Sequence, residues 1–116
     1  MTIKEKITST LTPVGLPLGH RYISEPNNTF YITYFIYDID YERCDDKYYI
    51  SSYTVQVDLW SKTGEYQEHE QKIKSAMEMC DFYLSDEEEL YEYDTKLFHK
   101  GMRFILENLE NLKEVE

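Results

Sequence analysis

A chain of 116 residues with a formal net charge of −11 fits a single domain, spanning residues 1–116, with one hydrophobic core. Hydrophobic residues make up 41% and charged residues 30%, a composition typical of a globular protein. The negative charge disfavours sequence-specific nucleic-acid binding, which relies on Lys and Arg, and it disfavours anionic membrane surfaces. No apolar run has the length of a signal peptide or a membrane span, so we expect neither secretion nor membrane insertion.

The chain holds 12 tyrosines, whose rings pack while their hydroxyls stay in contact with water. Such a surplus suits half-buried margins and interfaces, and it equally suits strands, because Tyr is a good strand former. The two cysteines, Cys44 and Cys80, show no framework spacing. We interpret them as free thiols in a reducing cytosol.

The first residues predict a short amphipathic helix. Thr2 and Glu5 form a capping-box pattern. The apolar face repeats at every fourth position and consists of Ile3, Ile7 and Leu11. Prolines and glycines then predict a loop over residues 13–28.

Two strands are predicted in the middle of the chain. Residues 29–37 are dense in Tyr, Phe, Ile and Thr with bulky side chains on both faces, which indicates a strand covered on both sides. Residues 48–60 alternate, and their predicted core face consists of Tyr49, Tyr53, Val55, Val57 and Leu59. The polar face, expected to meet water or a neighbouring subunit, consists of Ser52, Thr54, Gln56 and Asp58.

Between these strands, residues 38–47 are interpreted as an acidic loop, mobile until it meets a neighbour. Its carboxylates, facing a lumen or a partner, are Asp38, Asp40, Glu42, Asp45 and Asp46. A calcium loop counted from Asp38 would place Arg43 and Tyr49 where Gly and a bidentate Glu are expected. A solvated acidic loop is therefore preferred to a metal site.

The second half of the chain predicts a helix followed by a hairpin. The helix covers residues 64–84, and its buried stripe consists of Tyr66, Ile73, Met77 and Cys80 or Leu84. Residues 90–94 and 97–106 are expected to pair as a hairpin, and residues 107–116 are compatible with a frayed helix. The predicted fold is α+β: an antiparallel-dominated sheet of about four strands, one main helix packed on one face, and a short N-terminal helix.

The chemistry of the remaining side chains argues against an enzyme. His69 begins a zinc-protease pattern, but Ile73 stands where the second ligand is required. His20, in the loop, and His99, in a strand, are interpreted as structural. There is neither a glycine-flanked serine elbow nor a Gly-rich phosphate loop. The prediction is a protein without catalytic residues, cofactor or metal.

The segment 57–62, Val-Asp-Leu-Trp-Ser-Lys, closes the second strand just before the main helix. This junction resembles that of phage tail completion proteins of the tail terminator, or tail-to-head joining, type. The order of elements along most of the chain is similar as well, and residues 94–104, with His99 and Arg103, look like the family's closing hairpin. Residues 107–116 depart from the family, because they are richer in Leu and acidic residues.

The resemblance implies a virion or prophage structural protein that forms a ring, typically a hexamer, at the head-proximal end of a long non-contractile tail. Its partners would be itself, the tail tube protein and the head-connector protein, first in the host cytoplasm and then in the virion. One helix covers only one side of a small sheet, so the aromatic residues of the first strand on the other side need cover. The first helix is predicted to supply part of that cover within the subunit or to reach across to the next subunit. This predicted interface consists of Ile3, Ile7, Leu11, Tyr31, Phe35 and Tyr37.

An alternative from a different class stays open. A small acidic protein–protein interaction module, such as a regulator or inhibitor of a basic partner, would have the same composition. The mass of the protein in solution and the position of its gene among head-connector and tail-tube genes would separate the two. A tail-side terminator and a head-side adaptor look alike at this level.

Overall fold

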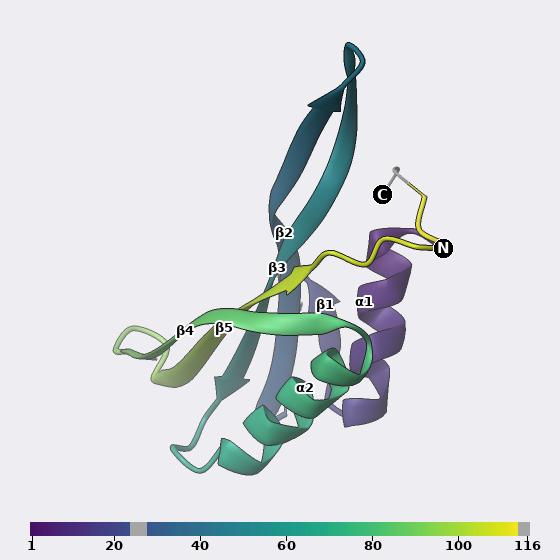
Figure 1. Ribbon diagram of the computed structural model, residues 1–116. Helices are drawn as coiled ribbons and strands as arrows, with labels where there is room; N and C mark the ends of the chain where they lie inside the picture. Colours follow the sequence, from purple (N-terminus) through teal and green to yellow (C-terminus); the bar gives the residue numbers. More distant parts are fainter. Residues whose placement is uncertain (24–27, 114–116) are drawn as a thin grey trace.

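The computed structural model describes residues 1–23 and 28–113, in which α-helices lie on one side of a five-stranded sheet with the order β1-β2-β3-β5-β4 (Figure 1). Along the chain the elements are α1 (Ile3–Leu11), the 3-10 turn η1 (Thr12–Val14), β1 (Leu18–His20), β2 (Phe30–Cys44), β3 (Lys47–Ser61), α2 (Gln67–Met79), β4 (Phe82–Glu92) and β5 (Leu97–Leu106). The α+β class with one main helix on the sheet and a short N-terminal helix is confirmed.

The sheet differs from the prediction in strand number and direction. It has five strands and is mixed, because β1 pairs parallel with β2 and places Leu18 beside Ile32. β1 has 3 residues and lies inside the predicted loop 13–28, which also contains η1. A strand this short shows no alternation that a sequence pattern could reveal. Residues 24–27 of the predicted loop lie outside the described residues.

Helix α1 begins with the predicted capping box. The Thr2 hydroxyl accepts a hydrogen bond from the Glu5 backbone N–H at 3.2 Å, and the Thr2 backbone N–H donates to Glu5 Oε1 at 3.0 Å. The apolar face of this helix is completely buried in the subunit's own core and consists of Ile3, Ile7 and Leu11. These residues lie on the same side of the sheet as α2, so the first helix does not cover the other side within the subunit as predicted.

Strand β3 supplies the centre of the core. Its predicted inward residues Tyr53, Val55, Val57 and Leu59 are buried and share one cluster with Ile73 and Met77 of α2. Tyr49, assigned to the same face, is 45% exposed. An irregularity in the β2–β3 register between Asp40 and Tyr41 shifts the alternation, and this end of β3 runs past the helices.

Helix α2 is shorter than predicted, because the chain reverses at Asp81 in the left-handed region (φ 74°) and enters β4 at Phe82. Leu84 therefore belongs to a strand, whereas Tyr66 is buried at the helix N-cap and Cys80 is partly buried at its C-cap. Leu84 follows Met77 by seven residues, which is two turns of a helix, so the apolar spacing by itself extended the predicted helix too far. The hairpin of β4 and β5 is confirmed, but β4 begins earlier than expected and includes the acidic residues 86–89.

The acidic segment 38–47 is not a loop, contrary to the prediction. β2 continues to Cys44, which pairs with Lys47 across a two-residue turn. The turn residues Asp45 and Asp46 have φ values of 52° and 64°, and positive φ at both positions is what a type I′ hairpin turn requires. The carboxylates avoid burial in this ribbon because all of their side chains are exposed. We call the projecting hairpin, residues 38–52, the arm; it extends one end of a molecule 51 Å long (Figure 1).

The C-terminal segment passes beside α1. Residues 107–113 contain no helix, and Leu109 and Leu112 pack against the core. Residues 114–116 of the segment predicted as a frayed helix lie outside the described residues. The Lys113 backbone N–H donates to the Met1 carbonyl at 2.9 Å, which brings the two ends of the described chain together. No helix among the described residues is long and apolar enough to cross a membrane.

Candidate assembly surfaces

One face of the sheet, opposite the helices, is left without a covering helix in the described part of the chain; we call it the open face. Residues paired directly across neighbouring strands lie on the same face of the sheet, so the strand register shows which residues make up the open face. Three rows run across β2, β3, β5 and β4: Tyr31, Trp60, His99 and Leu90; Thr33, Asp58, Gly101 and Glu88; Phe35, Gln56, Arg103 and Asp86.

The first row is a stack of aromatic rings. The centroids of Tyr31 and Trp60 lie 6.0 Å apart with an interplanar angle of 12°, and those of Trp60 and His99 lie 4.0 Å apart at 7°. The Trp60 indole N–H donates to Thr33 Oγ1 at 2.9 Å. Burial raises the pKa of the Tyr31 phenol, and the negative charge of Glu92 raises it further. The rings are therefore held in place before any partner arrives.

Hydrogen bonds around Asp58, which is only 5% exposed, connect residues of all three rows; we call them the polar ladder. His99 Nε2 lies 2.6 Å from Asp58 Oδ1, and the Gln56 amide donates to the same oxygen at 2.9 Å. Arg103 Nε in turn donates to Gln56 Oε1 at 3.2 Å. Gly101 makes room for the carboxylate, since a Cβ there would lie 3.2 Å from Asp58 Oδ1. Asp58 lies on the face opposite the core, as predicted, but the side chains around it on that face bury its carboxylate.

The recess beside the ladder is small. Its volume is about 70 Å³, and its lining includes Gln56, Glu88, His99 and Arg103. Ligand pockets usually measure roughly 300–1,000 Å³, so this recess suits water rather than a cofactor. Among residues 1–23 and 28–113, no group of three or more His, Cys, Asp or Glu side chains is placed to hold a metal ion.

The interface residues predicted from β2 are partly covered within the subunit. Tyr31 is buried in the aromatic row, and the Arg21 guanidinium lies 5.8 Å from the Phe35 ring. Tyr37 is 49% exposed, with the Arg103 guanidinium 3.8 Å from its ring. Tyr37 is thus the most accessible of the predicted interface residues.

The other candidate residues are scattered. The carboxylates Asp38, Asp40, Glu42, Asp45 and Asp46 are all exposed on the arm. His69 is partly buried against the Phe30 ring, with centroids 4.3 Å apart. Cys44 is an exposed free thiol at the tip of the arm. The pair of Asp58 and His99 was missed because its residues lie 41 positions apart and meet only through the β3–β5 register.

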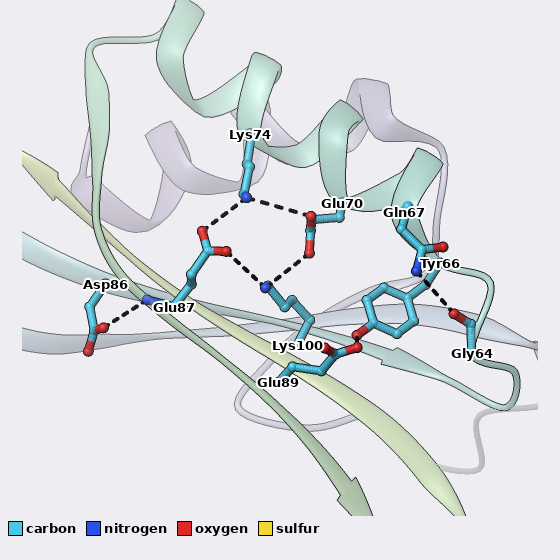
Figure 2. A network of polar contacts seen from close by, with 9 residues as sticks. All are labelled: Gly64, Tyr66, Gln67, Glu70, Lys74, Asp86, Glu87, Glu89 and Lys100. Atoms are coloured by element: carbon cyan, nitrogen blue, oxygen red, sulfur yellow. Dashed lines mark hydrogen bonds and ion pairs between the residues drawn. The ribbon is translucent and has the colours of Figure 1, made fainter.

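A second polar network ties α2 to strands β4 and β5 (Figure 2). Lys100 Nζ lies 2.9 Å from Glu87 Oε1 and 3.3 Å from Glu70 Oε1, while Lys74 Nζ lies 2.9 Å from Glu87 Oε2 and 3.5 Å from Glu70 Oε2. The Tyr66 hydroxyl donates to Glu89 nearby. Two cations and two carboxylates alternate here, which fixes the orientation of α2 on the sheet.

The charges of this network reinforce one another. Hydrogen bonds from Lys100 and Lys74 lower the pKa of Glu87. Burial by itself would lower the pKa of Lys100, but its bonds to Glu87 and Glu70 outweigh burial and raise it. Both groups are therefore held in their charged forms in the folded protein.

The outer side of α2 borders an apolar recess of about 590 Å³, which we call the groove. Its lining consists of Pro13, Val14, Glu68, Gln71, Lys72, Ser75, Ala76 and Met79. Met79 is 85% exposed although it is a large apolar side chain. The residues that line the groove belong to η1 and α2. Helix α2 lies at the end of the molecule away from the arm (Figure 1).

The sequence matches no protein-family model and no curated protein sequence. In structure the chain is similar to a chain described as "Virion of native gene transfer agent (GTA) particle", with a TM-score of 0.63 and 7% sequence identity. The likeness covers 90% of this chain and 89% of that chain. The two chains therefore share a fold over nearly their whole lengths, and the fold is one that occurs in a virion particle.

Proposed function

We propose that this protein is a virion or prophage structural protein that forms a ring at the head-proximal end of a phage tail, where it ends the tail tube and joins it to the head connector. The observation that carries the proposal is the fold shared with a chain of a gene transfer agent virion over 90% of this chain. The resemblance of residues 57–62 and of the element order to tail completion proteins supports the same kind of particle.

The distribution of surfaces supports a role in assembly. A ring needs two different complementary surfaces on every subunit, so that each copy contacts the next head to tail. The described residues present an arm at one end, a groove near the other end and an open sheet face between them. We assign the open face, with its fixed aromatic row, to contact with the tail tube or the head connector.

The remaining chemistry is consistent with a structural protein. The recess on the open face is about 70 Å³, and we propose no reaction there. The net charge of −11 suits a ring through which DNA passes, because carboxylates repel phosphates and let the duplex slide. A hexamer on the tail side is the arrangement that we propose.

Arrest of tube growth tests this function. Tail tube protein from the genome that encodes this chain is allowed to polymerise with increasing amounts of the purified protein, and tube lengths are measured by electron microscopy. We expect shorter tubes of more uniform length as the protein is added, and no effect from a Val57→Lys variant that we expect to be unfolded. Unchanged growth in excess protein would reject the terminator role and favour the acidic interaction module.

A further inference from the structure

The arm is a two-stranded ribbon that lacks the support of the rest of the sheet. β5 ends beside Tyr53, so within residues 1–23 and 28–113 the arm residues of β2 and β3 beyond that point pair only with each other. An isolated two-stranded ribbon is at best marginally stable in water. An arm built in this way gains stability from a surface that covers one of its sides.

The side that needs cover can be identified from the register. The core face of the ribbon passes through the pair Ile39 and Tyr53, then Tyr41 and Ile50, then Arg43 and Tyr48. Ile39 and Ile50 still touch the core, but Tyr41 is 58% exposed and Tyr48 is 68% exposed. The apolar stripe of the core thus runs out onto the arm and ends in two exposed phenol rings.

The groove has the properties of a receiving surface for these rings. It is lined by apolar side chains, including Val14, Ala76 and the exposed Met79, whose thioether makes favourable contacts with aromatic rings. Its charged lining consists of one Glu and one Lys, which are paired at 3.5 Å. The recess on the open face instead carries three carboxylates against one Arg, and this excess of negative charge would repel the acidic arm.

We propose that the arm of one subunit docks in the groove of a second copy of this chain; this contact rests on the proposed ring function. Tyr41 and Tyr48 cover Met79 and its neighbours, and the exposed carboxylates of the arm tip remain at the wet rim beside Lys72. Because arm and groove lie at different ends of the molecule, each copy can give its arm to the next one. Such a head-to-tail contact closes into a ring when its rotation permits.

Cysteine crosslinking tests this contact, since Cys44 is already an exposed thiol at the arm tip. In a Cys80→Ser background, Met79→Cys places a second thiol in the groove. Treatment of capped tail tubes with a short bismaleimide is expected to give a ladder of covalent oligomers. Two controls are expected to give none: Met79→Cys combined with Cys44→Ser, and Thr95→Cys in place of Met79→Cys, which puts the thiol at the β4–β5 turn.

The outcomes separate this inference from the proposed function. Capped tubes without a ladder of crosslinked subunits would overturn the arm–groove contact but not the terminator function. Crosslinks from Cys44 to tube protein or connector protein would also overturn the arm–groove contact and keep the terminator function. Crosslinking that stops at a dimer, with uncapped tubes, would support the contact and count against the ring.

A charge in the groove gives a second, independent test. Met79→Glu is expected to weaken self-association at least tenfold, measured by analytical ultracentrifugation or by occupancy of tube ends, while Met79→Leu keeps it. Because Met79 is 85% exposed, both variants should melt like the parent protein. Equal self-association of the Glu and Leu variants would overturn the contact.

Discussion

The alternating network on α2 makes a quantitative prediction for Lys100→Met. The substitution removes an ammonium group whose side chain is 12% exposed and which contacts Glu87 at 2.9 Å and Glu70 at 3.3 Å. Hydrogen bonds to charged groups contribute roughly 1.5–3 kcal/mol each. Lys74 remains to satisfy both carboxylates, so we expect a loss of about 1–3 kcal/mol in the free energy of unfolding rather than the sum of two bonds.

A double-mutant cycle isolates the pair. Glu87→Gln alone leaves two cations facing one carboxylate, and Lys100→Met alone leaves two carboxylates facing one cation. The double variant restores the charge balance and should be more stable than the two single losses predict. The expected coupling is about 1 kcal/mol, measured by urea unfolding. A coupling that is zero within error would refute the claim that these charges support one another.

The same network predicts a pH dependence. The folded-state pKa of Glu87 lies below its ordinary value of 4.5, so its stabilisation is complete above that value and is lost as the pH falls through the folded pKa. The folded-state pKa of Lys100 lies above 10.5, so its stabilisation is complete below that value and is lost as the pH rises through the folded pKa. In Lys100→Met the loss of unfolding free energy should be smaller both at low pH and at high pH, which urea unfolding across the pH range would measure.

Three further predictions follow from the two faces of the sheet and from the arm. Val57→Lys should unfold the domain because Val57 is completely buried, whereas Thr54→Lys, on the open face opposite Asp38, should melt like the parent in a thermal scan. Asp58→Ala should lower the free energy of unfolding by about 2 kcal/mol, because it leaves the N–H donors of His99 and Gln56 without their acceptor. The substitution should also shift the fluorescence emission of Trp60, which stacks on His99, and unchanged emission would contradict the stacked arrangement. The arm amides should exchange hydrogen faster than the rest of β3 in dilute protein and slow down in the assembled ring.

Features that depend on neighbours in sequence were predictable. Thr2 and Glu5 are three residues apart, and their capping box forms as expected. The alternation from Tyr53 to Leu59 correctly assigned the core face, because helices cover only that side of the strand.

Features that depend on strand register were not predictable. The partnership of Asp58 with His99 and the stacking of Trp60 on His99 require β5 to lie beside β3 in one register. The exposed position of Tyr49 arises from a register irregularity that no composition signal marks. The acidic residues of the arm suggested a loop because carboxylates avoid burial, but an exposed two-stranded ribbon keeps them in contact with water equally well.

Imaging the ends of tail tubes assembled with this protein shows whether it caps a phage tail. We expect a closed ring, one subunit thick, at one end of each tube, and no such density when the protein is left out. Tubes whose two ends remain bare at saturating protein would show that it does not cap them.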